Sequence, residues 1–157
     1  MKHFTFRPLQ KTLFLACVCL ASFSCKKNST NAQATTDNQI ITNYIAAHHL
    51  NAKATGSGLY YVMTAQGTGT QPTSASTVTV SYKGYLTNGT VFDQNSQGYS
   101  VSLSSVIPGW QEGIPLFKAG GRGTLLIPSA LGYGTQATGS IPANSVLIFD
   151  ILLVSVP

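Results

Sequence analysis

The sequence has very few acidic residues. Asp and Glu number four among 157 residues, against nine Lys and Arg, and charged residues make up only 8% of the chain. A disordered acidic tail, a coiled coil or a long charge-dense helix would each need more charge than this. Apolar residues nevertheless account for 43% of the chain, so a hydrophobic core can form. The length suffices for one domain and is too short for two ordinary ones.

Cysteine is also scarce, and its positions point to the amino terminus. Lys2, Arg7 and Lys11 precede a short apolar run over residues 13–23. A basic start, a short apolar run and a small-residue exit are typical of a secretory signal, and the run is too short for a stable transmembrane helix. Two of the three cysteines lie in this run, so Cys25 would be the only thiol of the mature chain. Neither a disulfide framework nor a cysteine metal site is then expected.

Cys25 stands at the point where the signal would be cleaved. It is followed by Lys26-Lys27 and by a tract of polar residues. This arrangement resembles a bacterial lipoprotein signal, which implies cleavage before the cysteine and acylation of its sulfur. Ser22 departs from the strict lipoprotein pattern, which has Leu at that position. An ordinary cleavable signal is the alternative.

We therefore predict three amino-terminal parts with different roles. Residues 1–24 form a lipoprotein signal peptide, residues 25–37 a lipidated flexible tether, and residues 38–55 a short helix and lead-in. The signal carries three basic residues and no acidic one, so its removal leaves a nearly neutral chain, and no nucleic-acid partner is expected. The expected location is the cell envelope of a Gram-negative bacterium, as a periplasmic or outer-membrane lipoprotein held by Cys25.

The rest of the chain predicts one short helix and then a β-rich domain. Ile41, Tyr44 and Ile45 fall at helical spacing, and Asp37 could cap a helix over about residues 38–50. Later runs alternate between apolar and polar residues and are separated by turn residues such as Asn88-Gly89. The predicted strands cover residues 59–63, 77–85, 90–93, 100–103, 123–127 and 145–156, with a loop at 94–98, a short helix near 110–117 and a glycine-rich loop at 132–140. The fold class is therefore α+β, with an antiparallel sheet that buries one face on the short helix.

The mature chain lacks the groups that most enzyme chemistry needs. Its acids are Asp37, Asp93, Glu112 and Asp150, and its two histidines are adjacent in the predicted helix. No Ser-His-Asp set, phosphate-binding loop or dinucleotide-binding pattern is present. No metal and no cofactor are expected. Aromatic residues are plentiful instead, and most such residues in proteins are ordinary core.

Three segments in the β-rich part nevertheless form a specific pattern. They are VSYKGYL (80–86) with GTVFD (89–93), then VIPGWQEG (106–113), and then IPSALGYG (127–134) with IPANSVLIFD (141–150). Together, in this order and spacing, they resemble the FKBP-type peptidyl-prolyl cis/trans isomerases over about residues 58–157. The resemblance implies a twisted antiparallel sheet of about five strands wrapped around a short helix, with the isomerase domain over 56–157.

The resemblance also implies an apolar binding pocket. Trp110 matches the residue that lies beneath the proline ring of a bound peptide. The backbone N–H of Ile107 is expected to hold a substrate carbonyl. The walls would be formed by Tyr82, Phe92, Val106, Ile107 and Phe149.

Other positions match the family's pocket in part. Tyr133 resembles a tyrosine whose hydroxyl bonds a substrate carbonyl, Asp93 matches a buried acid, and Ile141 would lie at the pocket rim. Val101 occupies a substrate-binding position at which many members have phenylalanine, and Tyr99 could replace another aromatic residue. No arginine accompanies Asp93 in the following loop, which departs from the family pattern.

The implied function is peptidyl-prolyl isomerisation in the folding of exported proteins. Rotation about an X–Pro bond breaks no covalent bond, so the scarcity of acids and bases is no obstacle. The implied partners are proline-containing unfolded or folding envelope proteins, with macrolide ligands of the family as possible pocket ligands, and a monomer is expected. The alternatives are an FKBP-like lipoprotein that holds peptides without catalysis and a structural envelope lipoprotein with a vestigial pocket.

Overall fold

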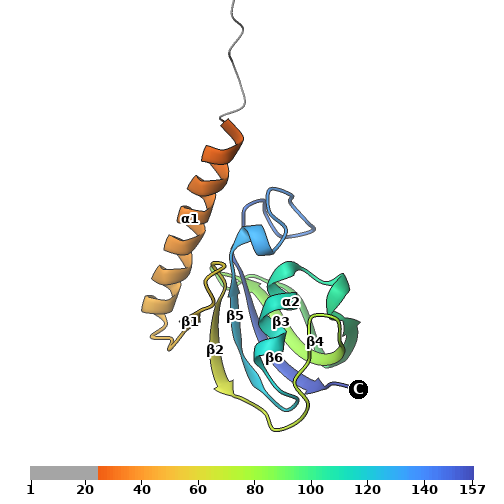
Figure 1. The fold of residues 1–157 in the computed structure, drawn as a ribbon. Helices are drawn as coiled ribbons and strands as arrows, with labels where there is room; N and C mark the ends of the chain where they lie inside the picture. Colours follow the sequence, from red (N-terminus) through yellow and green to blue (C-terminus); the bar gives the residue numbers. More distant parts are fainter. Residues whose placement is uncertain (1–24) are drawn as a thin grey trace, which may run out of the picture.

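Six strands form one antiparallel sheet that curves around a short helix (Figure 1). The computed structural model describes residues 25–157, and the signal peptide predicted over residues 1–24 lies outside them. The strands are β1 (Lys53–Ala54), β2 (Tyr60–Ala65), β3 (Thr77–Leu86), β4 (Val91–Ser102), β5 (Arg122–Ile127) and β6 (Leu147–Ser155). The helices are α1 (Cys25–Ala47) and α2 (Pro108–Gly113), with 3₁₀ turns η1 (Leu103–Ser105), η2 (Ile114–Leu116) and η3 (Ser129–Leu131). The predicted fold class is confirmed.

The strand order β1-β2-β5-β6-β3-β4 places the last strand inside the sheet. β6 pairs with β5 on one side and with β3 on the other, both antiparallel. One face of these strands forms the main core together with α2 and η2. Trp110 of α2, Ile114 of η2 and Phe117, which directly follows η2, belong to this core. Gly113 and Pro115 limit this helix, as the sequence predicts, because a proline cannot continue the helical hydrogen bonding. The segment that bears the candidate pocket residue Trp110 is thereby fixed against the middle of the sheet.

The β3–β4 hairpin follows the prediction at its turn but not along its second strand. Gly89 has a φ of +86°, and its N–H donates to the Leu86 carbonyl at 2.8 Å, so the predicted Asn-Gly turn is confirmed. The predicted loop over residues 94–98 is wrong, because β4 is continuous across it. Register shifts in the β3–β4 ladder absorb the extra residues there, and β4 is an edge strand whose polar side chains can face solvent.

Helix α1 differs most from the prediction. It begins at Cys25 rather than near residue 38, so residues 25–37 are helical and the prediction of a flexible tether is wrong. The hydroxyls of Thr35, Thr36 and Thr42 donate to carbonyls four residues earlier in the helix. Such hydroxyls satisfy themselves within a helix, so the polar composition did not exclude one. Neither α1 nor any other helix of residues 25–157 is long and apolar enough to cross a membrane.

The carboxy-terminal half of α1 packs on the face of the sheet opposite to α2. Ile41 is fully buried against Leu126 of β5 and Val146, which form a second, smaller core cluster. Leu126 alternates with Leu125, which points into the main core, and this alternation places α1 and α2 on opposite faces. Figure 1 shows α1 beside the sheet, with its amino-terminal end projecting past the domain.

Candidate functional site

A cavity of about 310 Å³ opens on the α2 side of the sheet. The surrounding segments are β3, β4, η1, the start of α2, the loop after η3, and β6. Its lining residues are Tyr82, Asp93, Tyr99, Ser105, Val106, Ile107, Trp110, Tyr133 and Phe149. Seven of the ten predicted pocket residues are in this set, and the structure brings them together from positions up to 67 residues apart.

Three aromatic rings form the buried base of the cavity. The Trp110 ring lies 5.0 Å from the Tyr82 ring and 5.2 Å from the Phe149 ring, measured between centroids, with interplanar angles of 82° and 79°. Edge-to-face contacts of this kind are favourable beyond simple burial. Trp110 and Phe149 are only 5% and 4% exposed, so the rings are fixed and the base of the cavity is apolar.

The Trp110 indole N–H is buried and has no hydrogen-bond partner among the described residues. A buried donor without a partner costs free energy. Tryptophan at this position is therefore explained by the shape and area of its ring rather than by a polar contact.

Tyr82 and Asp93 form the polar side of the cavity. The Tyr82 hydroxyl donates to Asp93 Oδ2 at 2.7 Å. Burial, followed by the hydrogen bond and the charge of Asp93, raises the pKa of Tyr82 above its usual range. The expectation that Asp93 is buried is wrong, because this residue is exposed on edge strand β4. An exposed carboxylate keeps its hydration and needs no arginine, which fits the lack of an arginine in the segment that follows it.

The Tyr82 hydrogen bond predicts a specific dependence of stability on pH. Because the pKa of Tyr82 is raised on folding, its contribution is present below the ordinary tyrosine pKa of about 10 and is lost as pH rises above that value. Wild type should therefore lose more stability between about pH 9 and pH 11 than Tyr82→Phe does. Urea unfolding of both proteins at several pH values measures this difference. The pKa of Tyr85 is also raised, by burial and by Asp150. Because Tyr85 is present in wild type and in Tyr82→Phe, its contribution cancels in the comparison. Equal losses would contradict the prediction.

Three predicted pocket residues do not line the cavity. Phe92 is partly buried and packs edge-to-face on Phe149, 5.4 Å between centroids, so it supports the wall from behind. Val101 is partly buried and packs against the main core, and Ile141 is 5% exposed within the same core.

Tyr99, by contrast, lines the cavity and is 46% exposed. Ser105 was not predicted at all, and its position directly before Val106 is the only signal that could have indicated it.

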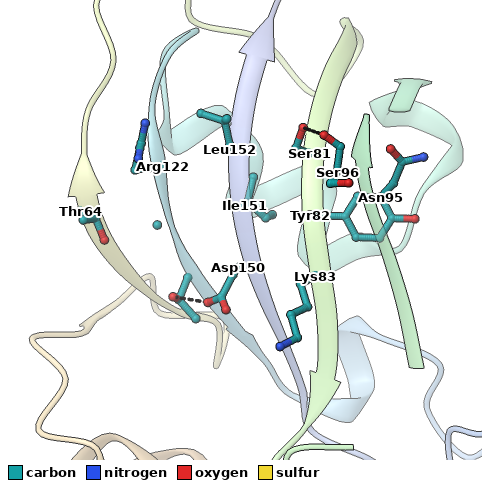
Figure 2. A pocket seen from close by; sticks show the side chains of 12 residues that line it. Thr64, Ser81, Tyr82, Lys83, Asn95, Ser96, Arg122, Asp150, Ile151 and Leu152 are labelled. Atoms are coloured by element: carbon teal, nitrogen blue, oxygen red, sulfur yellow. Dashed lines mark hydrogen bonds between the residues drawn. The ribbon is translucent and has the colours of Figure 1, made fainter. Parts of the chain in front are cut away.

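A second hollow lies on the opposite face of the sheet. It has a volume of about 400 Å³ and is lined by residues of β2, β5, β6, β3 and β4. Figure 2 shows its side chains spread over the strands, with Arg122 and Lys83 well separated. Thr124 Oγ1 donates to Asp150 Oδ1 at 2.8 Å, so that carboxylate has a local partner. Among residues 25–157 no three His, Cys, Asp or Glu side chains gather into a metal-binding group. The aromatic cavity is therefore the candidate site.

Comparisons with known proteins agree with the geometry. Residues 68–154 match the family of FKBP-type peptidyl-prolyl cis-trans isomerases. A probable isomerase FkpA from Neisseria meningitidis is 49% identical over 108 residues, which cover 66% of this chain and 40% of that protein. FkpA from Escherichia coli is 40% identical over 113 residues, which cover 70% of this chain and 42% of that protein. The chain thus spans less than half the length of these relatives.

Solved structures show the same likeness. A Pseudomonas syringae peptidyl-prolyl cis-trans isomerase superposes with a TM-score of 0.72 at 30% identity, covering 81% of this chain and 95% of that one. The Escherichia coli FkpA structure gives a TM-score of 0.70 at 34% identity, covering 83% and 65% respectively. With the family match over more than half of the sequence, the chain belongs to the FKBP-type peptidyl-prolyl cis-trans isomerase family.

Proposed function

We propose that the protein catalyses cis/trans isomerisation of X–Pro peptide bonds in the aromatic cavity. The observation that carries this proposal is the aromatic base of the cavity, in which the Trp110 ring packs edge-to-face with the rings of Tyr82 and Phe149. A proline ring is apolar and compact, and such a base offers it a dry surface of matching shape. The family match over residues 68–154 supports the same activity.

The reaction suits a cavity with few ionisable groups. Amide resonance sets a rotation barrier of about 20 kcal/mol, and the uncatalysed event takes tens of seconds. The twisted transition state has lost this resonance, so its carbonyl is less polar than that of the planar amide. An apolar base that fits the twisted form better than the planar one lowers the barrier, and each tenfold gain in rate needs about 1.4 kcal/mol of such preference.

Two polar groups at the rim would orient the peptide. The Ile107 carbonyl accepts hydrogen bonds from Trp110 and Gln111 at the start of α2, whereas the Ile107 N–H has no backbone partner in the described part of the chain. This N–H is suited to bind a substrate carbonyl. Tyr133 is 37% exposed and lines the cavity, so its hydroxyl can donate to a second carbonyl. A peptide held by these two hydrogen bonds would have its X–Pro bond above the aromatic base.

A proline-exchange assay tests the proposal. The purified protein should accelerate cis/trans exchange in a short peptide with one X–Pro bond, measured by NMR exchange between the two isomers. Exchange at the uncatalysed rate in the presence of folded protein would contradict it. Val101, whose departure from the phenylalanine of many family members would favour a non-catalytic peptide holder, packs against the core and does not line the cavity.

We further propose that the protein acts on exported proline-containing proteins from the cell envelope, held as a lipidated monomer by Cys25. The basic start, the short apolar run and the polar tract that surround Cys25 in the sequence support this. Membrane fractionation of wild type and Cys25→Ser tests the anchor, since the variant should move to the soluble fraction.

A further inference from the structure

A buried carboxylate joins helix α1 to the segment that leads into the cavity loop. Asp37 lies inside α1 rather than at the predicted helix start, and it is 0% exposed. Its Oδ2 accepts hydrogen bonds from the backbone N–H of Ser129 at 2.8 Å and from the Ser129 hydroxyl at 2.6 Å. Its Oδ1 accepts a third from the Gln33 side-chain amide at 2.7 Å. Three donors thus converge on one buried carboxylate.

Ser129 in turn holds both neighbours of Tyr133. The Ser129 carbonyl accepts hydrogen bonds from the N–H of Gly132 at 3.0 Å and from the N–H of Gly134 at 2.8 Å. Gly134 has a φ of +58°, a conformation that glycine adopts without strain. Because Tyr133 lies between the two glycines, the direction of its side chain depends on where Ser129 is fixed.

We propose that Asp37 is a positioning residue of the isomerase cavity, which acts through Ser129 to hold Tyr133 in place. This inference rests on the proposed function. Charge-assisted hydrogen bonds are short and directional, so the carboxylate fixes both donors of Ser129 at once. Isolating a carboxylate from water is costly, and a neutral or apolar contact would suffice to pack α1 on the sheet. Ile41 already provides such a contact.

Variants at Asp37 and its neighbour test the proposal. Asp37→Ala should raise KM for an X–Pro peptide by about fivefold with a smaller change in kcat, the effect of misaligning roughly one hydrogen bond to substrate. Asp37→Asn keeps an acceptor for Ser129 and should recover most of this loss. The matched control is Asn38→Ala, which removes a bond from the Tyr60 hydroxyl to the same helix but has no link to the loop. It should leave KM unchanged.

A double-variant comparison separates positioning from simple stabilisation. Tyr133→Phe should raise KM in wild type but add little in the Asp37→Ala background, because Tyr133 is already misplaced there. If the two substitutions raise KM in the double variant by the product of their separate factors, the proposal is wrong. If Asp37→Ala does not fold, Ser129→Ala provides the same comparison, since it removes one donor and keeps the backbone N–H. A wild type without catalysis would overturn the proposed function itself, whereas an active wild type with independent effects would overturn only the role of Asp37.

Discussion

Replacing Trp110 with leucine is expected to lower kcat/KM for an X–Pro peptide by at least about tenfold, which corresponds to about 1.4 kcal/mol of lost transition-state stabilisation. Leucine fills part of the space but offers no flat surface between Tyr82 and Phe149, which now meet the ring edge-to-face. Trp110→Phe keeps an aromatic surface and should retain more activity than Trp110→Leu. Peptide exchange measured by NMR, with folding checked by circular dichroism, gives both values.

The stability of Trp110→Leu should fall less than its activity. A large aromatic residue truncated in a core commonly costs about 3–5 kcal/mol, but leucine retains much of the buried area. Leucine also removes the buried indole N–H that has no partner in the described residues. The control is Phe117→Leu, because Phe117 is fully buried in the same core and does not line the cavity. That variant should lose stability and keep its activity per folded molecule. Equal activity losses in both variants would show that Trp110 acts only through the fold.

The features that the sequence predicted correctly are encoded locally. Val78 and Val80 alternate with polar residues on β3, and both are buried in the core. Asn88-Gly89 specifies its own turn because glycine tolerates the positive φ. The spacing of Trp110 and Ile114 indicates one helical face, and both residues are buried. In each case neighbours in the chain determine the conformation.

The features that were missed depend on distant partners. Asp37 has the residue type and position of a helix cap, yet its partner Ser129 is 92 residues away. The resemblance implies that Phe92 is part of the cavity wall, whereas the structure packs it on Phe149, at a register shift of the β3–β4 ladder between Gly84 and Tyr85. Strand alternation does not reveal where such a shift occurs. The exposure of Asp93 likewise follows from β4 being an edge strand, which depends on the order of all six strands.

Gly84 provides the second large effect, because it lies where two aromatic rings approach the backbone. This buried glycine of β3 pairs with Asp93 on β4 and with Phe149 on β6. A Cβ atom added to it would lie 2.5 Å from Phe92 Cε2 and 2.7 Å from Phe149 Cε1. Both distances are far below a normal carbon–carbon contact. The rings must therefore shift. Phe149 forms the base of the cavity with Trp110, so a shift of its ring changes the shape of that base.

Gly84→Ala is accordingly expected to destabilise the protein by about 1–3 kcal/mol, the usual cost of overpacking a core. Without a clash, alanine in a strand interior is favoured over glycine by about 0.5–1 kcal/mol. A loss of stability in Gly84→Ala would therefore indicate that the new methyl group clashes with the rings. Activity per folded molecule should fall as well, since the displaced Phe149 ring alters the base of the cavity. Urea unfolding measures the first effect and peptide exchange the second. Adding Phe92→Leu gives one ring's space to the new methyl group and should restore part of the stability. A Gly84→Ala protein as stable as wild type would mean that the rings pack less tightly on β3 than the geometry requires.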